Sequence, residues 1–268
     1  MQPIEQVTIT YRNFPGLARL HWPQSFTLSV SGPPQDHIFK AIKTSRTFYE
    51  CDLLEEIALR IPQSHGTVLD VGANIGNHSL FFSKVLNKYV ISIEPQQEAV
   101  NFLKLNMRAN MVSNGGEILR IGMGEHPGNA TIVNTETQKL GLGAAKLAVD
   151  QVTLGAESVQ VSTIDSLCRN RPDLPPVQLI KIDTEGMEGQ VLRGAIDTIA
   201  KQKPLIAAEA ASTDAVNEIR SILSPYGYTQ SGPFAWTPTY IFSATPMTSL
   251  RKLAWRAVRS IRHGLTML

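Results

Sequence analysis

The chain has 268 residues, of which 43% are apolar and 18% are charged, and its formal net charge is +2 at pH 7. This composition is typical of a folded chain with a sizeable core and excludes a disordered or highly charged protein. No apolar run approaches the ~18 residues that a membrane-spanning helix needs, and residues 1–6 lack the pattern of a secretory signal. Cys51 and Cys168 are the only cysteines, so we expect neither a disulfide framework nor a cysteine metal site, and we expect a cytoplasmic protein.

The N-terminal region combines a strand pattern with a helical pattern. Phe26, Leu28 and Val30 alternate with polar residues, which predicts a half-buried strand. Within residues 36–60 the apolar residues recur at helical spacing instead. We expect residues 1–45 to form a β/α extension that packs on the core of the protein.

From residue 67 the chain alternates between short β-rich runs and amphipathic helical patterns. Such an alternation predicts an α/β fold, in which a mainly parallel sheet carries helices on both faces. Further short β patterns follow, the last two of which predict an antiparallel pair at the sheet edge. The predicted strands are residues 67–71, 89–93, 117–121, 128–134, 157–163, 178–182, 204–209, 228–231 and 240–243, the predicted helices are residues 75–87, 96–110, 187–201 and 213–224, and the segment from Gly141 to Gly143 shows no periodicity.

A glycine-containing turn follows the first strand of this alternation. Gly72, Asn74 and Gly76 interrupt the apolar pattern, and helical spacing resumes after them. Because glycine has no Cβ, such a turn lets the backbone pass close to a ligand, and the next helix directs free N–H groups at it. The spacing differs from the G-x-G-x-x-G of a dinucleotide site, and Asp70 stands two positions before the first glycine. Glu94 ends the next strand, 22 positions after Gly72, where a carboxylate can accept hydrogen bonds from both hydroxyls of a ribose.

Acidic side chains stand at the carboxyl ends of three predicted strands. Glu94 follows the predicted strand 89–93, Asp183 follows the strand 178–182 and Glu209 ends the strand 204–209. Ligands of open α/β sheets bind outside the carboxyl ends of the strands, and the glycine turn lies at the same edge. The sequence therefore predicts a ligand site there.

Several segments stand in a fixed order along the chain, and the most diagnostic is KIDTEGMEGQVLRGA at residues 181–195. The full set is FYE, VLDVGANIGNHS, ISIEP, NFLKLNMRAN, STIDSL, LIKIDTEGMEGQVLRGA and PLIAAE. In this order they resemble the FkbM-type methyltransferase family, over about residues 48–210. The resemblance implies a class I methyltransferase domain of Rossmann-like fold at residues 46–244, S-adenosyl-L-methionine as the cofactor, and O-methylation of sugar or polyketide hydroxyls. The chain departs from the family at Thr239, where asparagine is expected.

The resemblance places cofactor contacts in the turn and at the end of the following strand. Asp70 is expected to fix the turn through backbone N–H groups or to hold the ammonium group of the cofactor through water, and the glycines allow close approach. The asparagines of the turn and His78 are expected to bond the cofactor carboxylate, although His78 is equally well explained as an ordinary residue of the helix start. Glu94 is expected to hold the ribose hydroxyls. The predicted cofactor-binding residues are Asp70, Gly72, Asn74, Gly76, Asn77, His78, Glu94 and Pro95.

Asp183 and Glu185 are the candidate catalytic residues. Methyl transfer to a hydroxyl is an in-line displacement at a sulfonium, so the enzyme must align the reactants and accept or relay one proton. A carboxylate at this strand end suits either the general base or an anchor for the acceptor hydroxyl. The alternative is that Glu185 and Glu188 only satisfy a helix N-terminus, where an acidic group is worth ~0.3–1 kcal/mol. Nearby carboxylates also suit a hard divalent cation, but no ligand spacing supports one, so we predict no metal.

Residues 245–268 are predicted to form a basic amphipathic helix. Residues 247–268 hold five basic residues and no acidic one, whereas residues 1–246 hold 20 basic and 23 acidic residues. Apolar residues recur at helical spacing around Trp255, and such a helix can lie on an anionic membrane surface. The alternative is a helix that docks on the protein's own sheet or on a second subunit of a homo-oligomer. The slightly acidic body argues against nucleic acid as a partner.

The residues and the resemblance together predict a methyltransferase that acts on a small-molecule or glycan acceptor, with a hydroxyl of a saccharide or secondary metabolite as the methylated group. Two alternatives remain open. One is methylation of a protein or RNA nucleophile, and the other is a non-catalytic, membrane-associated scaffold that keeps the fold. Transfer of a radioactive methyl group separates an enzyme from a scaffold.

Overall fold

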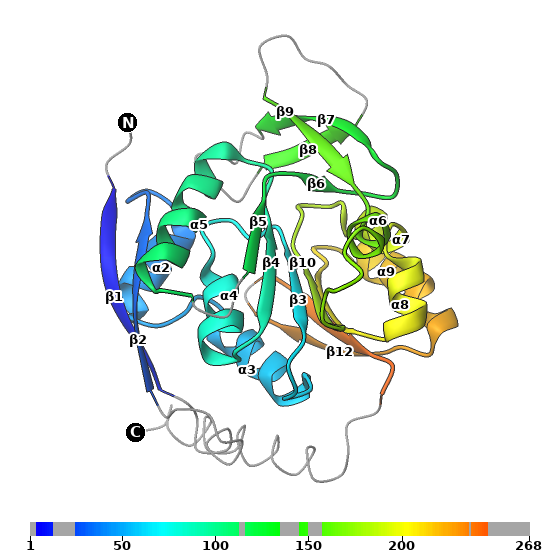
Figure 1. Ribbon diagram of the computed structural model, residues 1–268, viewed down its shortest axis with the longest axis horizontal. Coiled ribbons are helices and arrows are strands. Elements are labelled where there is room, and N and C mark those ends of the chain that lie inside the picture. Colours follow the sequence, from blue (N-terminus) through cyan, green and yellow to red (C-terminus); the bar gives the residue numbers. More distant parts are fainter. Residues whose placement is uncertain are drawn as a thin grey trace.

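A seven-stranded sheet forms the centre of the protein, with the strand order β12-β13-β11-β10-β3-β4-β5 (Figure 1). The strands from β11 to β5 are parallel, and β12 and β13 add an antiparallel pair at one edge. The α/β fold with a mainly parallel sheet is therefore confirmed. The strands are β3 (Thr67–Val71), β4 (Tyr89–Ile93), β5 (Gly116–Leu119), β10 (Val177–Ile182), β11 (Leu205–Glu209), β12 (Thr229–Phe234) and β13 (Thr239–Ser243). The computed structural model describes residues 4–12, 25–112, 116–134, 145–149, 157–235 and 237–245.

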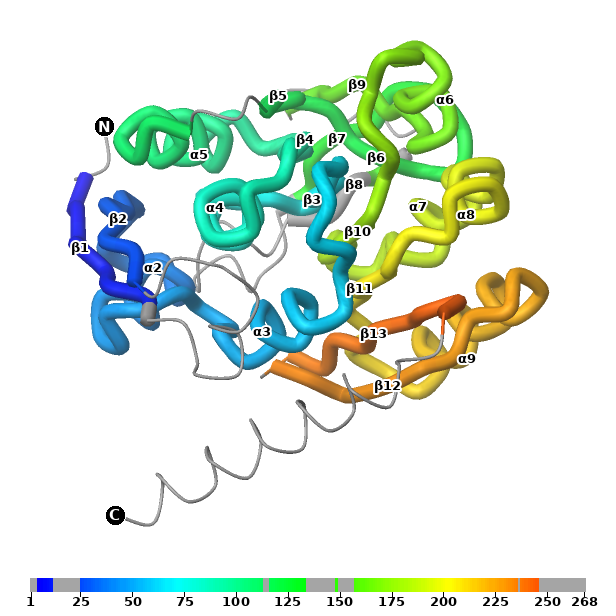
Figure 2. The backbone as a smooth tube through the Cα atoms, turned by 60° about the horizontal axis from the view of Figure 1, so that its bottom comes forward, coloured from blue at the N-terminus to red at the C-terminus, as the bar shows by residue number. Residues whose placement is uncertain are grey.

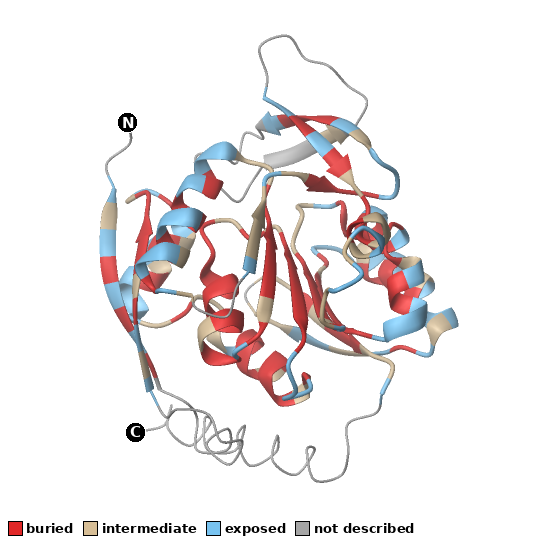
Figure 3. Cartoon of the chain, in the orientation of Figure 1, coloured by how far each residue is buried: buried red, intermediate tan, exposed pale blue. Residues whose placement is uncertain are grey.

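Both faces of the sheet are covered by helices, because successive residues of a strand point to opposite faces and both sets are apolar here. In β3, Val68 packs into one hydrophobic cluster and Leu69 into the other. Figure 2 shows α4 and α5 on one side of the parallel strands and α7 and α8 on the other, and Figure 3 shows that the central strands are buried. The helices with Val68 are α3 (Cys51–Arg60), α4 (Asn77–Leu80) and α5 (Gln97–Ala109), and those with Leu69 are α6 (Ile164–Arg169), α7 (Glu188–Arg193), α8 (Ile196–Gln202) and α9 (Thr213–Leu223).

The predicted helix 187–201 is two helices in the structure, because the chain turns at Gly194. This glycine packs so closely on a neighbouring loop that a Cβ would collide with a backbone carbonyl oxygen. The second helix receives its cap from α6, where the Asp165 carboxylate accepts hydrogen bonds from the N–H groups of Asp197 (2.9 Å) and Thr198 (2.8 Å). The prediction of one continuous helix was wrong, since helical spacing does not show a cap that comes from another segment.

The predicted helix 75–87 starts later than expected and changes its geometry. Gly76 has a φ of 90°, so the regular helix begins only at Asn77. From Phe81 to Val85 the helix is π-helical (η1), and the Ser83 hydroxyl donates to the carbonyl oxygen of Ser79 at 2.8 Å. Such π-helical turns are rare. The spacing of the apolar residues does not reveal the π-helical turn, because the helical spacing continues unchanged through residues 81–85.

The N-terminal region forms a two-stranded antiparallel sheet from β1 (Glu5–Arg12) and β2 (Ser25–Gly32), followed by α2 (His37–Ser45). Asn106 of α5 and Asn110, which follows the last residue of this helix, bind the outer edge of β2. Asn106 accepts from the N–H of Ser31 at 2.7 Å and donates to its carbonyl oxygen at 2.9 Å, and Asn110 makes the same pair of bonds to Ser29. These side-chain amides take the place of a further strand, so the hairpin is tied to the core.

A second, four-stranded sheet has the order β6-β9-β7-β8. The chain leaves the main sheet after Leu119, so the predicted strand 117–121 ends early and Gly122 and Met123 pair with β9 instead. β8 was not predicted, and the segment from Gly141 to Gly143 lies outside the described residues. The strands are β6 (Gly122–Met123), β7 (Gly128–Asn134), β8 (Ala145–Val149) and β9 (Ser158–Ser162).

None of the helices in the described part of the chain is long and apolar enough to cross a membrane. The predicted C-terminal helix lies beyond residue 245, where the described residues end. Its membrane contact and the boundaries of the N-terminal extension therefore remain predictions.

Candidate active site

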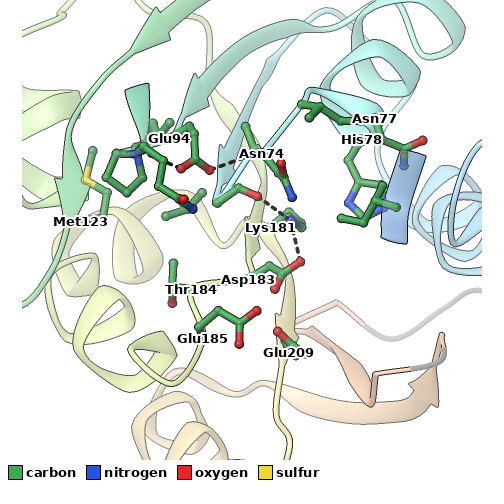
Figure 4. A pocket seen from close by; sticks show the side chains of 18 of the residues that line it. Asn74, Asn77, His78, Glu94, Met123, Lys181, Asp183, Thr184, Glu185 and Glu209 are labelled. Atoms are coloured by element: carbon green, nitrogen blue, oxygen red, sulfur yellow. Dashed lines mark hydrogen bonds and ion pairs between the residues drawn. The ribbon is translucent and has the colours of Figure 1, made fainter. Parts of the chain in front are cut away.

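A cleft of about 1120 Å³, including space open to solvent, lies at the carboxyl ends of the parallel strands (Figure 4). This edge of an open α/β sheet is where ligands bind. Met123 and Glu94 line one end, and His78 lines the other, with Asn74 between them. The cleft can therefore hold an extended ligand along the ends of β4 and β3.

The glycine turn joins two strand ends at the base of the cleft. Gly72 has a φ of 78°, and a Cβ there would collide with the carbonyl oxygen of Asp183. Glycine is therefore required for the contact between β3 and β10, in addition to any approach of a ligand. Gly76 does not line the cleft; a Cβ there would lie 2.6 Å from Leu103 Cδ1, so this glycine makes room for α5.

Glu94 is buried at the end of β4, where it holds the glycine turn in place. Its Oε2 accepts a hydrogen bond from the N–H of Asn74, and its Oε1 accepts one from the N–H of Gln96, each at 2.9 Å. Burial raises the pKa of Glu94 to about 7, although both hydrogen bonds favour the ionised form. Each carboxylate oxygen keeps a further lone pair, so Glu94 can also accept hydrogen bonds from ligand hydroxyls.

Lys181 is a buried cation within β10, beneath the cleft. Its Nζ lies 3.1 Å from Asp183 Oδ2, 3.6 Å from Asp70 Oδ1 and 3.2 Å from the carbonyl oxygen of Gly72. Burial alone would lower the pKa of Lys181, but the charges of Asp183 and Asp70 raise it above its ordinary value. The lysine therefore stays charged and links the carboxyl ends of β3 and β10.

Asp183, Glu185 and Glu209 form an acidic group on the other wall of the cleft (Figure 4). Burial favours a protonated Asp183, yet the Lys181 ammonium and a hydrogen bond with Glu209 hold its pKa below the usual range. Burial and the hydrogen bond to Asp183 raise the pKa of Glu209 to about 10. Glu209 thus stays protonated and donates a hydrogen bond to the ionised Asp183, whose side chain is 37% exposed.

The same acidic group has the spacing to hold a metal ion, because one oxygen from each residue lies within 4.8 Å of the others. Carboxylates alone are common without a cation, and Asp183 is already neutralised by Lys181. The prediction of no metal remains a prediction.

A family model described as the methyltransferase FkbM domain matches residues 70–229, which is more than half of the chain. The chain belongs to the FkbM methyltransferase family. It is 30% identical over 157 residues to methyltransferase sdnD of Sordaria araneosa, and the match covers 49% of this chain and 61% of that protein.

Two solved structures resemble this FkbM-family chain. One is methyltransferase FkbM from Methylobacillus flagellatus, with 24% identity, a TM-score of 0.47, and coverage of 68% of this chain and 44% of that chain. The other is precorrin-6y C5,15-methyltransferase from Geobacter metallireducens, with 14% identity, a TM-score of 0.42, and coverage of 74% and 87%. Both TM-scores are below 0.5, so the family assignment rests on the domain match.

Most of the predicted site residues of this FkbM-family chain meet in the cleft. Asp70 does not line it. It is fully buried, and its Oδ2 accepts a hydrogen bond from the Ser79 hydroxyl at 2.6 Å while its Oδ1 faces Lys181. Asp70 therefore supports the turn through these side chains and not through backbone N–H groups. The predicted residues that line the cleft are Gly72, Asn74, Asn77, His78, Glu94, Pro95, Asp183 and Glu185.

Sequence reasoning missed several residues of the cleft. Lys181 had a signal, since a charged residue between isoleucines interrupts an otherwise apolar buried strand. Tyr49 and Glu50 also line the cleft; the FYE segment of the family resemblance contains both, and this order of segments was the signal that could have placed them at the site. Glu188 proved to be structural: its Oε1 accepts hydrogen bonds from the N–H groups of Thr184 (3.0 Å) and Gly186 (3.1 Å).

Replacing Glu94 with alanine should weaken S-adenosylmethionine binding by about 1.5–3 kcal/mol, the scale for hydrogen bonds to a charged group. The variant loses the carboxylate that holds the N–H of Asn74 and that we expect to accept the ribose hydroxyls. Calorimetric titration measures the affinity, and Glu98→Ala, an exposed acid on α5, is the matched control. An unchanged affinity in folded Glu94→Ala would remove Glu94 from the binding site.

Proposed function

We propose that this protein transfers the methyl group of S-adenosylmethionine to a hydroxyl of a saccharide or secondary metabolite. The observation that supports this most strongly is the division of the cleft. A carboxylate suited to ribose and a set of buried acceptors line one wall, and an acidic group with an ionised Asp183 lines the other. The first wall suits the cofactor, and the second suits a hydroxyl donor.

The residues on the first wall fit the cofactor. Among the described residues, Asn74 Oδ1 and His78 Nε2 are buried atoms without a hydrogen-bond partner, as expected of groups that serve a ligand. Glu94 stands between them and Met123, at the position for the ribose (Figure 4). When bound, S-adenosylmethionine supplies a methyl group on a positively charged sulfur.

The second wall favours a neutral acceptor with hydroxyl groups. An ionised Asp183 accepts a hydrogen bond from a hydroxyl and so orients its oxygen. Glu185 and Glu209 add carboxyl groups beside it. Among the described residues that line the cleft, Lys181 is the only lysine or arginine that balances this negative charge. Phosphate groups of RNA would be repelled by this charge, which favours a saccharide or metabolite hydroxyl over a nucleic acid.

Radioactive methyl transfer tests the proposal. Purified protein is incubated with tritium-labelled S-adenosylmethionine and with separate metabolite, glycan, protein and RNA fractions of a lysate. The label should enter the metabolite or glycan fraction and resist mild alkali, because ethers are stable there and methyl esters are not. Label in the protein or RNA fraction, or in none, would contradict the proposal.

Deleting residues 247–268 should abolish binding to anionic vesicles and leave the melting temperature within ~1 °C. Each Lys or Arg near an anionic surface is worth about 1 kcal/mol, and this segment holds five, so the contact should weaken at high salt. Co-sedimentation with phosphatidylserine vesicles measures it, and neutral vesicles are the control. Precipitation of the truncated protein, or no co-sedimentation of the full chain, would favour a helix docked on the protein itself or on a second subunit.

A further inference from the structure

Glu50 reaches the cleft from outside the strand–helix alternation. Its backbone is left-handed, with a φ of 54°, which is uncommon for a residue with a side chain. It stands at the N-cap of α3, but its side chain makes no capping hydrogen bond. Its carboxylate lines the cleft instead, so an acid that could have served the helix end is directed at a ligand site.

The first two residues of α4 fix the position of Glu50. The Asn77 side chain accepts a hydrogen bond from the N–H of Tyr49 and donates one to its carbonyl oxygen, each at 3.0 Å. His78, the next residue of α4, has its Nε2 3.5 Å from Glu50 Oε2, and both side chains are only 8% exposed. One donor and one acceptor of the Asn77 amide therefore serve the backbone beside Glu50, which leaves one N–H of Asn77 for the cofactor carboxylate that the sequence assigned to it.

His78 acts as a hydrogen-bond acceptor toward the cleft. Burial and the nearby Lys181 lower the pKa of His78 to about 4, so the imidazole is neutral at physiological pH. It also hydrogen bonds with the backbone of Tyr49, and within the described residues its Nε2 has no hydrogen-bond partner. A neutral imidazole has one donor and one acceptor nitrogen, and the nitrogen that faces Glu50 is the acceptor.

Three acceptors thus line the part of the cleft away from Met123. They are the Glu50 carboxylate, His78 Nε2 and Asn74 Oδ1, and the last two are buried without a partner in the described part of the chain. Burial and the charge of Asp183 raise the pKa of Glu50 to about 7, which shows how poorly its charge is compensated. Buried acceptors without donors are costly, and an ammonium group relieves this cost because it brings three donors and a positive charge.

We infer that Glu50, together with Asn74 and His78, binds the ammonium group at the amino-acid end of S-adenosylmethionine. This inference rests on the proposed function, since it requires that the cofactor lies in the cleft with its ribose at Glu94. It reverses the expectation that His78 serves the cofactor carboxylate, because a carboxylate there would face the acceptor nitrogen of His78 and the charge of Glu50. Glu50 is then a cofactor-binding residue that the glycine-turn motif does not contain.

Calorimetric binding of two ligands tests the inference without an acceptor substrate. One ligand is S-adenosylhomocysteine, and the other is its deaminated analogue, which has hydrogen in place of the ammonium group and keeps the carboxylate. Glu50→Gln should bind S-adenosylhomocysteine about 10- to 100-fold more weakly, the scale of a lost hydrogen bond to a charged group, and should bind the analogue with unchanged affinity. Asn74→Gly, which suits the φ of 49° at that position, should show the same selectivity.

Two further variants serve as controls. Glu56→Gln removes a charge from the same helix outside the cleft and should change neither affinity. Glu94→Gln should weaken both ligands alike, because both contain the ribose. The inference is overturned if Glu50→Gln binds S-adenosylhomocysteine as the wild type does, or loses both ligands equally. If the wild type binds neither ligand, the result contradicts the proposed function as well. If the wild type binds both, the variants test the role of Glu50 alone.

Discussion

Replacing Asp183 with asparagine should lower methyl-transfer turnover by about 100-fold or more, within the range for losing a positioned acid or base. Asp183 lies on the wall of the cleft that is proposed to hold the acceptor, and Lys181 and Glu209 hold it in its ionised form. Such a carboxylate accepts the hydrogen bond of an acceptor hydroxyl and stabilises the positive charge that develops on its oxygen during methylation. An asparagine keeps the size but loses the charge, so the rate should fall while the affinity for S-adenosylmethionine stays nearly the same.

Steady-state turnover of label into the identified acceptor fraction, paired with calorimetric cofactor binding, measures this split. Asp197→Asn on the exposed face of α8 is the matched control and should leave both quantities unchanged. Glu185→Gln is measured beside them, and a larger loss there would transfer the role to Glu185. If cofactor affinity and turnover fall together in Asp183→Asn, the residue serves binding or folding and not the reaction.

Replacing Lys181 with methionine should lower the free energy of unfolding by about 3–5 kcal/mol, the usual cost of leaving a buried charge without its partner. The Lys181 side chain is 5% exposed, and the Asp70 side chain that it faces is fully buried. For a chain of this size the melting temperature should fall by roughly 10 °C. Thermal unfolding followed by circular dichroism measures the change.

A double variant separates the charge effect from lost packing. Asp70→Asn in the Lys181→Met background removes the buried charge that has lost its partner, so it should recover part of the stability, whereas in the wild type it should be destabilising. Lys104→Met, an exposed lysine on α5, is the control and should melt with the wild type. If Lys181→Met also melts with the wild type, Lys181 does not hold the strand ends together.

The sequence alone determined the central sheet and placed the ligand site at the carboxyl ends of its strands. Strands such as β3 and β4 are continuous apolar runs because both faces are buried, and the residues at their carboxyl ends follow from the chain direction. Parallel strands share one edge for these ends, which is why Glu94 and Asp183 could be placed together before their geometry was known. The sequence did not predict the break at Gly194, because the cap of α8 comes from Asp165. It did not predict β8, because that strand depends on pairing with β7.

The tertiary structure alone decided what several of these residues do. Nothing in the sequence indicates that Gly72 contacts Asp183. Asp70 and Lys181 lie close together only because β3 and β10 are neighbours in the sheet. Glu50 entered the site because Asn77 binds the backbone of Tyr49 across 28 positions of the chain. Periodicity reports the face on which a residue lies, since burial repeats with the backbone. It does not report which distant side chain completes a hydrogen bond or an ion pair, because that depends on how the elements pack.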